Sequence, residues 1–589
     1  MNIVVSTLNA KYIHTCLALR YLKTYCEPDF KIDMAEYTIK DPVMNIVSDL
    51  YSRNPDVIGF SCYIWNIEET IPIIEMMKKI KPDVKIVLGG PEVSYDVPQW
   101  LERLEHVDFI VVGEGEETFK DLLQAFEKEE DVESVAGIAY MKNGQPFRTG
   151  PRPKLDLKSV PSPFRVEEDL PQLSKRVTYI ETSRGCPYSC SFCLSSIEVG
   201  VRYFDIGMMK EEIRFLMENG ARTIKFVDRT FNIRRDYALE MFDFLIKEHL
   251  PGTVFQFEIT ADIMRPEVID FLNEHAPAGL FRFEIGVQST NDNTNDLVER
   301  RQNFEKLTRT VTTVRDGGKI VQHLDLIAGL PEENYDSFRK TFNDVFEFRI
   351  EEVQLGFLKM LRGTGMRLRA DNHDYIYMDK APYEILGNNV LSFDEIIKIK
   401  RVEDVLEKFW NDHRMDTTVS YLIDHVFPSA FDFFQQFGDY WETRGWSRIG
   451  HQLEDLFKRL HSFLSVRGIP NLEIVEGLMK YDYFIRQKHK PRKPWWNFSM
   501  DKATQSTYLR FLADHPEKVS GDFKELNLSE KELHKHVMIE RLSFDLNLFL
   551  TDDELVGKDT LLIVYFDPKQ KSATSFTLHD EQTKITEIV

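Results

Sequence analysis

Short apolar runs alternate with amphipathic helical stretches from the start of the chain to about residue 375. Within residues 1–145 the runs predict five strands, and the stretches between them predict helices such as Ile67–Lys79. The predicted strands are Ile3–Ser6, Lys31–Tyr37, Val57–Cys62, Lys85–Leu88 and Phe109–Val112. Such an alternation predicts an α/β fold with a doubly wound parallel sheet, flavodoxin-like or Rossmann-like in form.

A second series of strand and helix patterns occupies residues 176–375, after a linker over residues 146–175. The linker contains Gly150-Pro151-Arg152-Pro153 and Pro161-Ser162-Pro163, which regular structure does not accommodate. The predicted strands are Val177–Thr182, Thr223–Asp228, Val254–Thr260, Phe281–Val287, Val321–Ile327 and Val353–Leu358. A series of six βα units suits an open, partial (βα)6 barrel, whose sites lie at the carboxyl ends of the strands.

Period-two alternation sorts the barrel side chains into two sets. In Phe255–Thr260 and Phe281–Gln288 the apolar residues would face the outer helices. The polar set would face the interior: Gln256, Glu258, Thr260, Arg282, Glu284 and Gln288. Burying these groups is costly unless they bind a ligand or one another, and both explanations are open.

The alternation stops at about residue 376, and helical periodicity with frequent aromatic residues takes over, as in Phe393–Phe409 and His451–Val466. We expect residues 376–589 to form a mainly helical domain that ends in a β-hairpin, with strands Thr560–Phe566 and Ala573–Leu578. One basic segment, Arg486–Trp496, ends in two tryptophans. It could bind RNA or another anion, or it could be a loop that its tryptophans anchor to the core.

Composition narrows the class of protein. The chain has 589 residues, of which 42% are hydrophobic and 29% charged, as in soluble globular proteins. Its net charge of -22 argues against sequence-independent nucleic-acid binding, so no DNA partner is expected. The N-terminus has no signal-peptide pattern and no apolar run is long enough to span a membrane, so we expect a cytoplasmic protein without a membrane partner.

Three of the six cysteines form a C-x3-C-x2-C motif at Cys186, Cys190 and Cys193. Thiolates at this spacing suit an iron–sulfur cluster. A cubane has four irons, so three cysteines leave one iron free to bind a substrate. Zinc would need a fourth ligand nearby, and a disulfide would need an oxidising compartment. The other cysteines lie far upstream, so we expect one cluster per chain.

The motif follows a predicted strand and is flanked as Ser183-Arg184-Gly185-Cys186-Pro187. This arrangement resembles the cluster motif of radical S-adenosylmethionine (SAM) enzymes. The resemblance implies a 4Fe-4S cluster held by the three cysteines, SAM chelated to the open iron, and reductive cleavage of SAM to a 5′-deoxyadenosyl radical. It also implies an external electron donor such as flavodoxin or ferredoxin.

The first domain carries two glycine motifs at the ends of its fourth and fifth strands, Gly89-Gly90-Pro91-Glu92 and Gly113-Glu114-Gly115-Glu116. Together with the radical SAM motif they resemble the cobalamin (B12)-binding radical SAM family, and residues 376–589 resemble an uncharacterised extension in one branch of it. Many cobalamin domains carry Asp-x-His-x-x-Gly after the first strand. In that motif the histidine binds cobalt. The segment Leu8–His14 does not match its spacing, so whether His14 contacts the cofactor is left open.

The resemblance and the strand ends together select candidate residues for the cofactor sites. The expected cofactor contacts of the first domain are Asn9, Ser61, Tyr63, Trp65, Gly89, Gly90, Pro91, Glu92, Gly113, Glu114, Gly115 and Glu116. The expected contacts of the barrel are Asp228, Glu258, Glu284 and Gln288. Asp228-Arg229 stands where many radical SAM enzymes have Gly-Gly-Glu.

The family implies a cobalamin-dependent methyltransferase that acts on an unactivated carbon or phosphorus of an unknown small-molecule, peptide or RNA substrate. In that mechanism one SAM methylates cobalamin, and a second yields the radical that activates the substrate. Three alternatives remain: a B12-containing enzyme that catalyses a rearrangement or cyclisation, an iron–sulfur RNA-modification or RNA-binding protein that uses the basic tryptophan-rich segment, and a redox sensor that binds no SAM.

Overall fold

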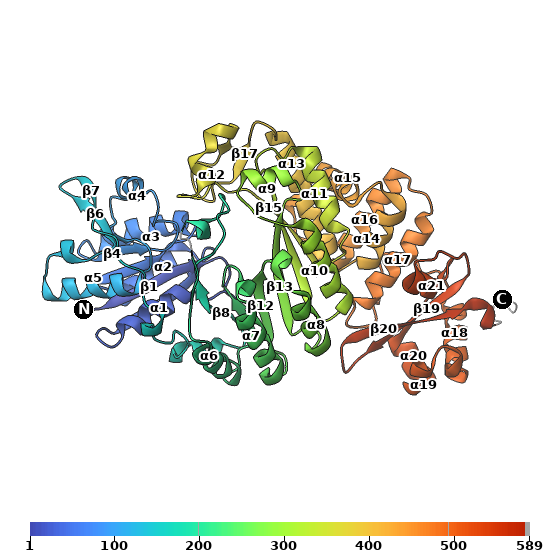
Figure 1. The fold of residues 1–589 in the computed structure, drawn as a ribbon. Helices are drawn as coiled ribbons and strands as arrows, with labels where there is room; N and C mark the ends of the chain where they lie inside the picture. The colour runs from blue at the N-terminus through green and yellow to red at the C-terminus, as the bar shows by residue number, and fades with distance from the viewer. Residues whose placement is uncertain (198–199, 493, 584–589) are drawn as a thin grey trace. The chain divides into compact units, whose positions relative to one another are not determined.

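The computed structural model describes residues 1–197, 200–492 and 494–583. The chain divides into two compact units, Met1–Ile396 and Ile397–Val589. The first unit contains both α/β regions, and the second contains most of the helical region (Figure 1). No helix within the described residues has both the length and the apolar composition needed to cross a bilayer.

Seven strands form the first sheet, in the order β2-β1-β3-β4-β5-β6-β7. Their bounds are β1 Ile3–Asn9, β2 Ile32–Thr38, β3 Val57–Ser61, β4 Lys85–Gly89, β5 Phe109–Val111, β6 Ile138–Lys142 and β7 Gln145–Arg148. The first five are parallel, which confirms the predicted doubly wound sheet. The antiparallel hairpin β6–β7 was not predicted, because β7 is a short strand that contains a proline, is polar at both ends and is only partly buried.

Helices cover both faces of this sheet (Figure 1). One core joins the sheet to α2, α3 and α4, and a second core joins it to α1 and α5. The bounds are α1 Leu17–Cys26, α2 Val43–Ser52, α3 Ile67–Ile80, α4 Val97–Arg103 and α5 Glu116–Lys128. Since the strands are parallel, their carboxyl ends share one edge, where the loops of the predicted site lie.

Six parallel strands form the second sheet, in the order β15-β14-β13-β12-β11-β8. Their bounds are β8 Val177–Ile180, β11 Thr223–Phe226, β12 Val254–Ile259, β13 Phe281–Gln288, β14 Val321–Ala328 and β15 Glu352–Phe357. The order follows the sequence and the end strands do not pair, so the sheet is the open partial barrel that the pattern predicts. Burial alternates along β12 and β13 as predicted, with the phenylalanines buried and the polar set partly exposed, and β14 shows the same alternation.

Helices connect the barrel strands and pack their apolar faces on the sheet. Their bounds are α6 Ile206–Glu218, α7 Arg235–Glu248, α8 Pro266–His275, α9 Asp292–Leu297, α10 Phe304–Gly317, α11 Tyr335–Phe346 and α12 Gly365–Leu368. Phe242 of α7 packs on Phe257 and Phe283 of the strands, with ring centroids 5.2 and 5.9 Å apart. Two short pairs complete the unit: β9 Ser183–Arg184 with β10 Arg202–Tyr203, and β16 Ile376–Tyr377 with β17 Ile385–Gly387.

Helices dominate the C-terminal region, as predicted. Their bounds are α13 Phe393–Leu406, α14 Asp416–Tyr421, α15 Ala430–Thr443, α16 Leu453–Arg467, α17 Leu472–Ile485, α18 Lys502–Asp514, α19 Gly521–Glu525, α20 Glu530–His536 and α21 Leu546–Asp552. The predicted hairpin is present as β19 Thr560–Asp567 and β20 Ser572–His579, and β18 Val537–Leu542 adds a third strand that was not predicted.

Candidate functional site

The three cysteines of the C-x3-C-x2-C motif line one cavity of about 280 Å³ at the carboxyl ends of the barrel strands. Cys186 and Cys190 are each 8% exposed. Burial raises the pKa of both thiols, and the nearby Arg300 guanidinium opposes this effect at Cys190. In the described part of the chain, no three His, Cys, Asp or Glu side chains converge as a single metal ion requires. A cubane cluster does not need this convergence, because each thiolate binds a different iron.

The backbone before the motif is fixed by close packing. Gly185 has φ +101, and a Cβ there would lie 2.0 Å from the carbonyl oxygen of Gly200. Only glycine can occupy this position without displacing the facing backbone at Gly200. Cys186 accepts a hydrogen bond of 3.3 Å from the Gly200 amide, so the turn that carries the first cysteine is tied to the end of the motif loop.

Three of the four barrel residues expected at the cofactor line the cysteine cavity: Glu258, Glu284 and Gln288. Burial raises the pKa of Glu258, which makes no hydrogen bond or ion pair among the described residues. Glu284 instead accepts two bonds of 2.7 Å from Lys225. Glu284 is therefore satisfied by another side chain of the barrel, as the second of the two explanations requires of polar groups that bind one another. Glu258 lines the cavity, and its carboxylate has no such partner in the described structure.

Gln288 ends strand β13 in the left-handed region, with φ 69. A Cβ on Gly286 would lie 2.4 Å from its side-chain nitrogen, so glycine is needed beside it. Its carbonyl oxygen is buried without a partner in the described structure. An unsatisfied buried acceptor at a cavity wall is the kind of group that a ligand satisfies.

Asp228 does not line the cysteine cavity, so this geometry gives no support to its predicted role as a cofactor contact. It is 1% exposed and accepts bonds from the Thr182 amide and hydroxyl and from the Ser183 hydroxyl, at 2.5 to 3.2 Å. Thr182 and Ser183 precede the cysteine motif, so this carboxylate holds the chain that leads into it.

A second cavity of about 510 Å³ lies between the carboxyl edge of the first sheet and the barrel. Asn9, Tyr63, Trp65 and Glu116 from the predicted set line it. Tyr63 and Trp65 stack, with ring centroids 4.4 Å apart and planes at 8°. Their flat face supplies a broad apolar wall for a large planar ligand.

A slot of about 120 Å³ continues into the first domain, and the predicted Ser61, Gly89, Gly90, Gly113, Gly115 and Glu116 line it. A Cβ on Gly90 would lie 2.5 Å from the Cys62 carbonyl, so close strand packing requires this glycine. A Cβ on Gly113 would meet no atom within 4 Å. Larger side chains in place of these glycines would project into the slot and reduce the space available to a ligand.

The other predicted residues of the glycine motifs do not line either space. Pro91 is exposed, and the Glu92 carboxylate accepts a bond of 2.5 Å from the Tyr383 hydroxyl. Glu114 lies 3.2 Å from Arg184, accepts a bond of 2.8 Å from the Leu155 amide and also pairs with Arg202. Glu92 and Glu114 therefore join the first domain to later parts of the unit, and we no longer assign them to cofactor contact.

Arg184 is the centre of a buried ion cluster at the wall of the second cavity. It lies 2.6 Å from Glu116 and 2.8 Å from Glu181, in addition to its bond with Glu114. Tyr21 packs against the guanidinium at 5.0 Å. Since Arg184 stands two residues before Cys186, this cluster joins the glycine motif of the first domain directly to the cysteine motif.

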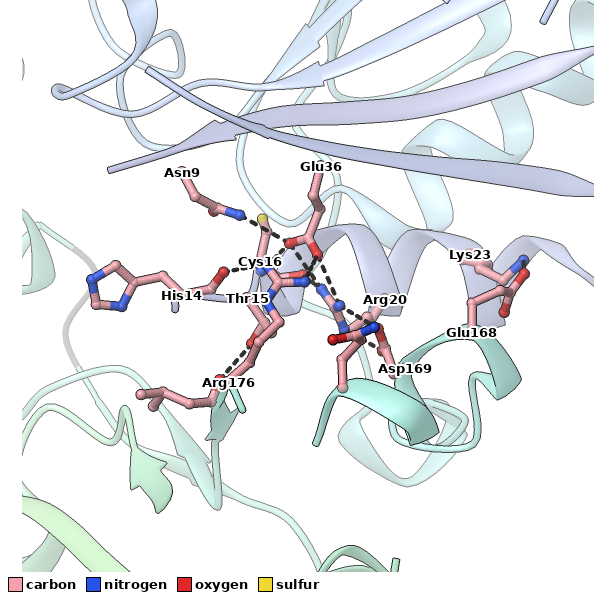
Figure 2. A network of polar contacts seen from close by, with 12 residues as sticks. Asn9, His14, Thr15, Cys16, Arg20, Lys23, Glu36, Glu168, Asp169 and Arg176 are labelled. Atoms are coloured by element: carbon pink, nitrogen blue, oxygen red, sulfur yellow. Dashed lines mark hydrogen bonds and ion pairs between the residues drawn. The ribbon is translucent and has the colours of Figure 1, made fainter. Parts of the chain in front are cut away.

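A second buried network holds the loop that bears His14 (Figure 2). Glu36 accepts bonds from the Cys16 amide at 2.6 Å and from Arg20 at 3.0 Å, and Arg176 pairs with it at 2.8 Å. Burial opposes the charge of Glu36, but the two arginines outweigh it and lower its pKa to about 2. Arg20 also bonds Asp169 of the linker at 2.6 Å.

The network fixes the backbone from residue 12 to residue 16, and His14 lines the second cavity as a result. Its Nδ1 lies 2.7 Å from the Tyr179 hydroxyl. Burial and the charge of Lys11 lower the pKa of His14, which keeps the imidazole neutral near pH 7. The neutral ring can donate or accept one further bond in the cavity.

Sequence reasoning missed several residues of these walls, including Tyr21, Glu181 and Arg300. Arg300 bonds Gln302 at 3.1 Å and the Gly286 carbonyl, and it approaches Cys190. No local pattern distinguishes these residues, since they reach the site through the docking of separate elements. Arg229 lines both cavities.

Comparison with known proteins identifies three regions of the chain. Residues 3–123 match the family described as "B12 binding domain", and residues 180–345 match the "Radical SAM superfamily". Residues 371–564 match a "Protein of unknown function (DUF4080)". The chain thus carries a B12-binding domain, a radical SAM domain and the C-terminal extension that the sequence analysis expected.

Two curated relatives illustrate the range of this group. The "Cobalamin-dependent radical SAM methyltransferase TokK" of Streptomyces tokunonensis is 28% identical over 349 residues, which are 55% of this chain and 50% of that protein. The "Anaerobic magnesium-protoporphyrin IX monomethyl ester cyclase" of Rubrivivax gelatinosus is 27% identical over 337 residues, or 55% and 59% of the two chains. The chain spans about half the length of the curated relatives that it matches first.

One solved structure shares the fold at low identity. The cobalamin-dependent S-adenosylmethionine radical enzyme OxsB, with aqua-cobalamin and S-adenosylmethionine bound, superposes with a TM-score of 0.54 and 17% identity. The match covers 81% of this chain and 80% of that one.

Proposed function

We propose that this chain, which carries a B12-binding domain followed by a radical SAM domain, is a cobalamin-dependent radical SAM methyltransferase. The observation that carries the proposal is the pair of cavities with Arg229 in both walls: one is lined by three cysteines, and the other faces the carboxyl edge of the first sheet. A group transferred from one cofactor to a substrate activated by the other requires such neighbouring sites.

Cys186, Cys190 and Cys193 would hold a 4Fe-4S cluster, and Glu258 and Gln288 offer a free carboxylate and a free carbonyl to SAM in the same cavity. The bound cluster would supply the electron that cleaves SAM, and an external donor such as flavodoxin or ferredoxin would reduce it. The protein's part is to fix the thiolates through Gly185 and Asp228 and to limit access of water to the cavity.

Cobalamin would occupy the second cavity and extend into the glycine-lined slot. When bound, it would supply a transferable methyl group. Tyr63 and Trp65 would pack against the ring, and the buried Arg20–Glu36–Arg176 network would keep the backbone around His14 in place. Residues 1–145, 146–175, 176–375 and 376–589 remain our proposed division into cobalamin domain, linker, barrel and C-terminal domain.

The first test is the iron, sulfide and cobalt content, with the visible spectrum, of protein purified without oxygen from cells supplied with hydroxocobalamin. About four irons and one cobalt per chain are expected. Iron without cobalt would refute methyl transfer and leave only radical chemistry. In the same protein, Cys190→Ala should abolish 5′-deoxyadenosine formation; retained formation would exclude the radical SAM assignment.

Cyclisation or rearrangement is the second candidate, because the cyclase of Rubrivivax gelatinosus aligns over as much of the chain as the methyltransferase does. Incubation with SAM labelled at its methyl group separates the two. Methyl transfer leaves the label on cobalamin or on a product, whereas cyclisation consumes SAM without incorporating the label.

The RNA-binding alternative depends on Trp495 and Trp496, the aromatic residues of the basic segment, as a surface on which bases could stack. Trp496 packs against Tyr483 and Phe484 at 5.4 and 5.2 Å, and its indole nitrogen lies 3.2 Å from the buried Glu540. Trp495 stands 5.3 Å from His461. The tryptophans therefore anchor the basic segment to its own unit, which supports the loop explanation over a stacking platform for bases. A redox sensor would bind no SAM, which equilibrium dialysis with labelled SAM tests.

A further inference from the structure

Arg229 is a cation at the place where the two cavities come together. It lines the cysteine cavity with Cys186 and Glu258, and it lines the second cavity with Tyr179 and Trp65. Its side chain is exposed, and within residues 1–197, 200–492 and 494–583 its guanidinium makes no hydrogen bond or ion pair. It stands three residues after the end of strand β11, next to Asp228, whose carboxylate is bound by Thr182 and Ser183.

The other arginines of the two walls are already occupied. Arg184 is bound by Glu114, Glu116 and Glu181, at 3.2, 2.6 and 2.8 Å. Arg300 donates to Gln302 and to the Gly286 carbonyl. Arg229 therefore differs from both: it has five N–H donors in a planar fork and nothing in the described structure that accepts them.

Glu258 is the carboxylate that Arg229 influences most clearly. The charge of Arg229 opposes the burial that raises the pKa of Glu258, but the two groups form no bond. Two opposite charges that share a wall and do not pair leave room for a ligand between them. A planar guanidinium in this setting matches the bidentate geometry of a carboxylate or a phosphate.

The position of Arg229 selects which ligand it would meet. If the proposed function holds, the substrate atom that is methylated must reach both cofactors, and the junction of the cavities, where Arg229 lines both walls, offers such a place. The methionine carboxylate of SAM is engaged at the open iron in the family that the chain resembles. The corrin ring of cobalamin carries neutral amides at its edge, so it does not need a guanidinium.

We infer that Arg229 binds an anionic group, a carboxylate or a phosphate, of the substrate at the junction of the two cavities. This inference rests on the proposed function and adds the chemical class of the substrate: an anion whose reacting carbon or phosphorus lies near its charged group. A neutral or cationic compound bound at this place would remove water from the guanidinium without supplying an opposite charge, and this costs free energy.

Arginine modification tests the inference without knowledge of the substrate. Protein loaded with iron, cobalamin and SAM is treated with phenylglyoxal, and modification of each arginine is followed by peptide mass spectrometry. Benzoate and phenyl phosphate serve as anionic probes, and benzamide is the neutral control of similar shape. Arg448, whose side chain is 80% exposed, is the positive control: any change in its modification shows that a probe acts on phenylglyoxal itself. Arg184, which is buried in its ion cluster, is the negative control and should stay unmodified.

We expect Arg229 to react with SAM bound and to be protected by benzoate or phenyl phosphate but not by benzamide. Binding of phenyl phosphate, measured by calorimetry, should weaken about tenfold in Arg229→Gln and be unchanged in Arg448→Gln, as expected for the loss of one charge-assisted pair. Protection by SAM alone would overturn the inference, because the residue would then bind SAM. Equal effects of anionic and neutral probes would overturn it too. Loss of cobalt from the starting protein would instead count against the proposed function.

Discussion

Arg184→Gln should destabilise the first unit and weaken the cobalamin site, because it removes the one guanidinium that three carboxylates share. Glu116 and Glu181 lie 2.6 and 2.8 Å from it, and their side chains are only 8% and 15% exposed. Breaking a buried ion pair by deleting one partner costs ~3–5 kcal/mol, since the remaining charge is buried without compensation. Glu114 loses less, because Arg202 still pairs with it.

Equilibrium urea unfolding of the cofactor-free protein measures this cost, and Arg214→Gln is the matched control. Arg214 binds Glu248 through two donors, but both side chains are about 40% exposed, so its loss should cost far less than the loss of Arg184. Adding Glu116→Gln to Arg184→Gln should recover part of the stability, because it removes one of the stranded charges. The reasoning fails if Arg184→Gln costs no more than Arg214→Gln, or if cobalamin affinity is the same in both variants.

Three further predictions follow from single contacts. Glu333 is fully buried and accepts bonds from Ser289 and Thr341, and burial raises its pKa from 4.5 to about 7. The folded state thus binds this proton more tightly than the unfolded state, so stability falls as pH rises from about 4.5 to 7, by ~3 kcal/mol in total. Glu333→Gln should remove this part of the pH dependence in urea unfolding at pH 4.5 to 8, and an unchanged slope would contradict it. Gly185→Ala should prevent cluster assembly, seen as loss of iron after reconstitution, because its Cβ would lie 2.0 Å from a backbone oxygen. The control Gly445→Ala, also at positive φ but with open space around it, should retain iron. Normal iron content in Gly185→Ala would refute the steric reasoning. Trp496→Ala should lower the unfolding free energy of the protein by up to ~3 kcal/mol, because Trp496 is only partly buried, without changing tRNA retention on a filter. Lost tRNA binding in a folded variant would revive the RNA hypothesis.

Local pattern was sufficient wherever one segment encodes its own geometry. Period-two alternation in Phe281–Gln288 matches the observed burial along β13 residue by residue, because a strand must present one face to the helices. The spacing of Cys186, Cys190 and Cys193 placed all three in one cavity for a similar reason: a short loop cannot carry them far apart. The hairpin β6–β7 was missed even though Asn143-Gly144 is a strong turn signal, with φ 52 and 77, because β7 is short, polar at both ends and interrupted by a proline.

The sequence by itself determined the two α/β regions, the cluster motif and the glycine-lined edge of the first sheet, since each depends on contacts between near neighbours in the chain. Only the tertiary structure decided the roles of the charged residues. Glu114 meets Arg184 across 70 positions, and Glu92 meets Tyr383 across 291, so these two glutamates of the glycine motifs join separate parts of the unit. The role proposed for Arg229 depends on the observation that no carboxylate in the described structure forms an ion pair with it. A charge is recognised as paired or free only after distant elements have docked, because its partner carries no local signal in the sequence.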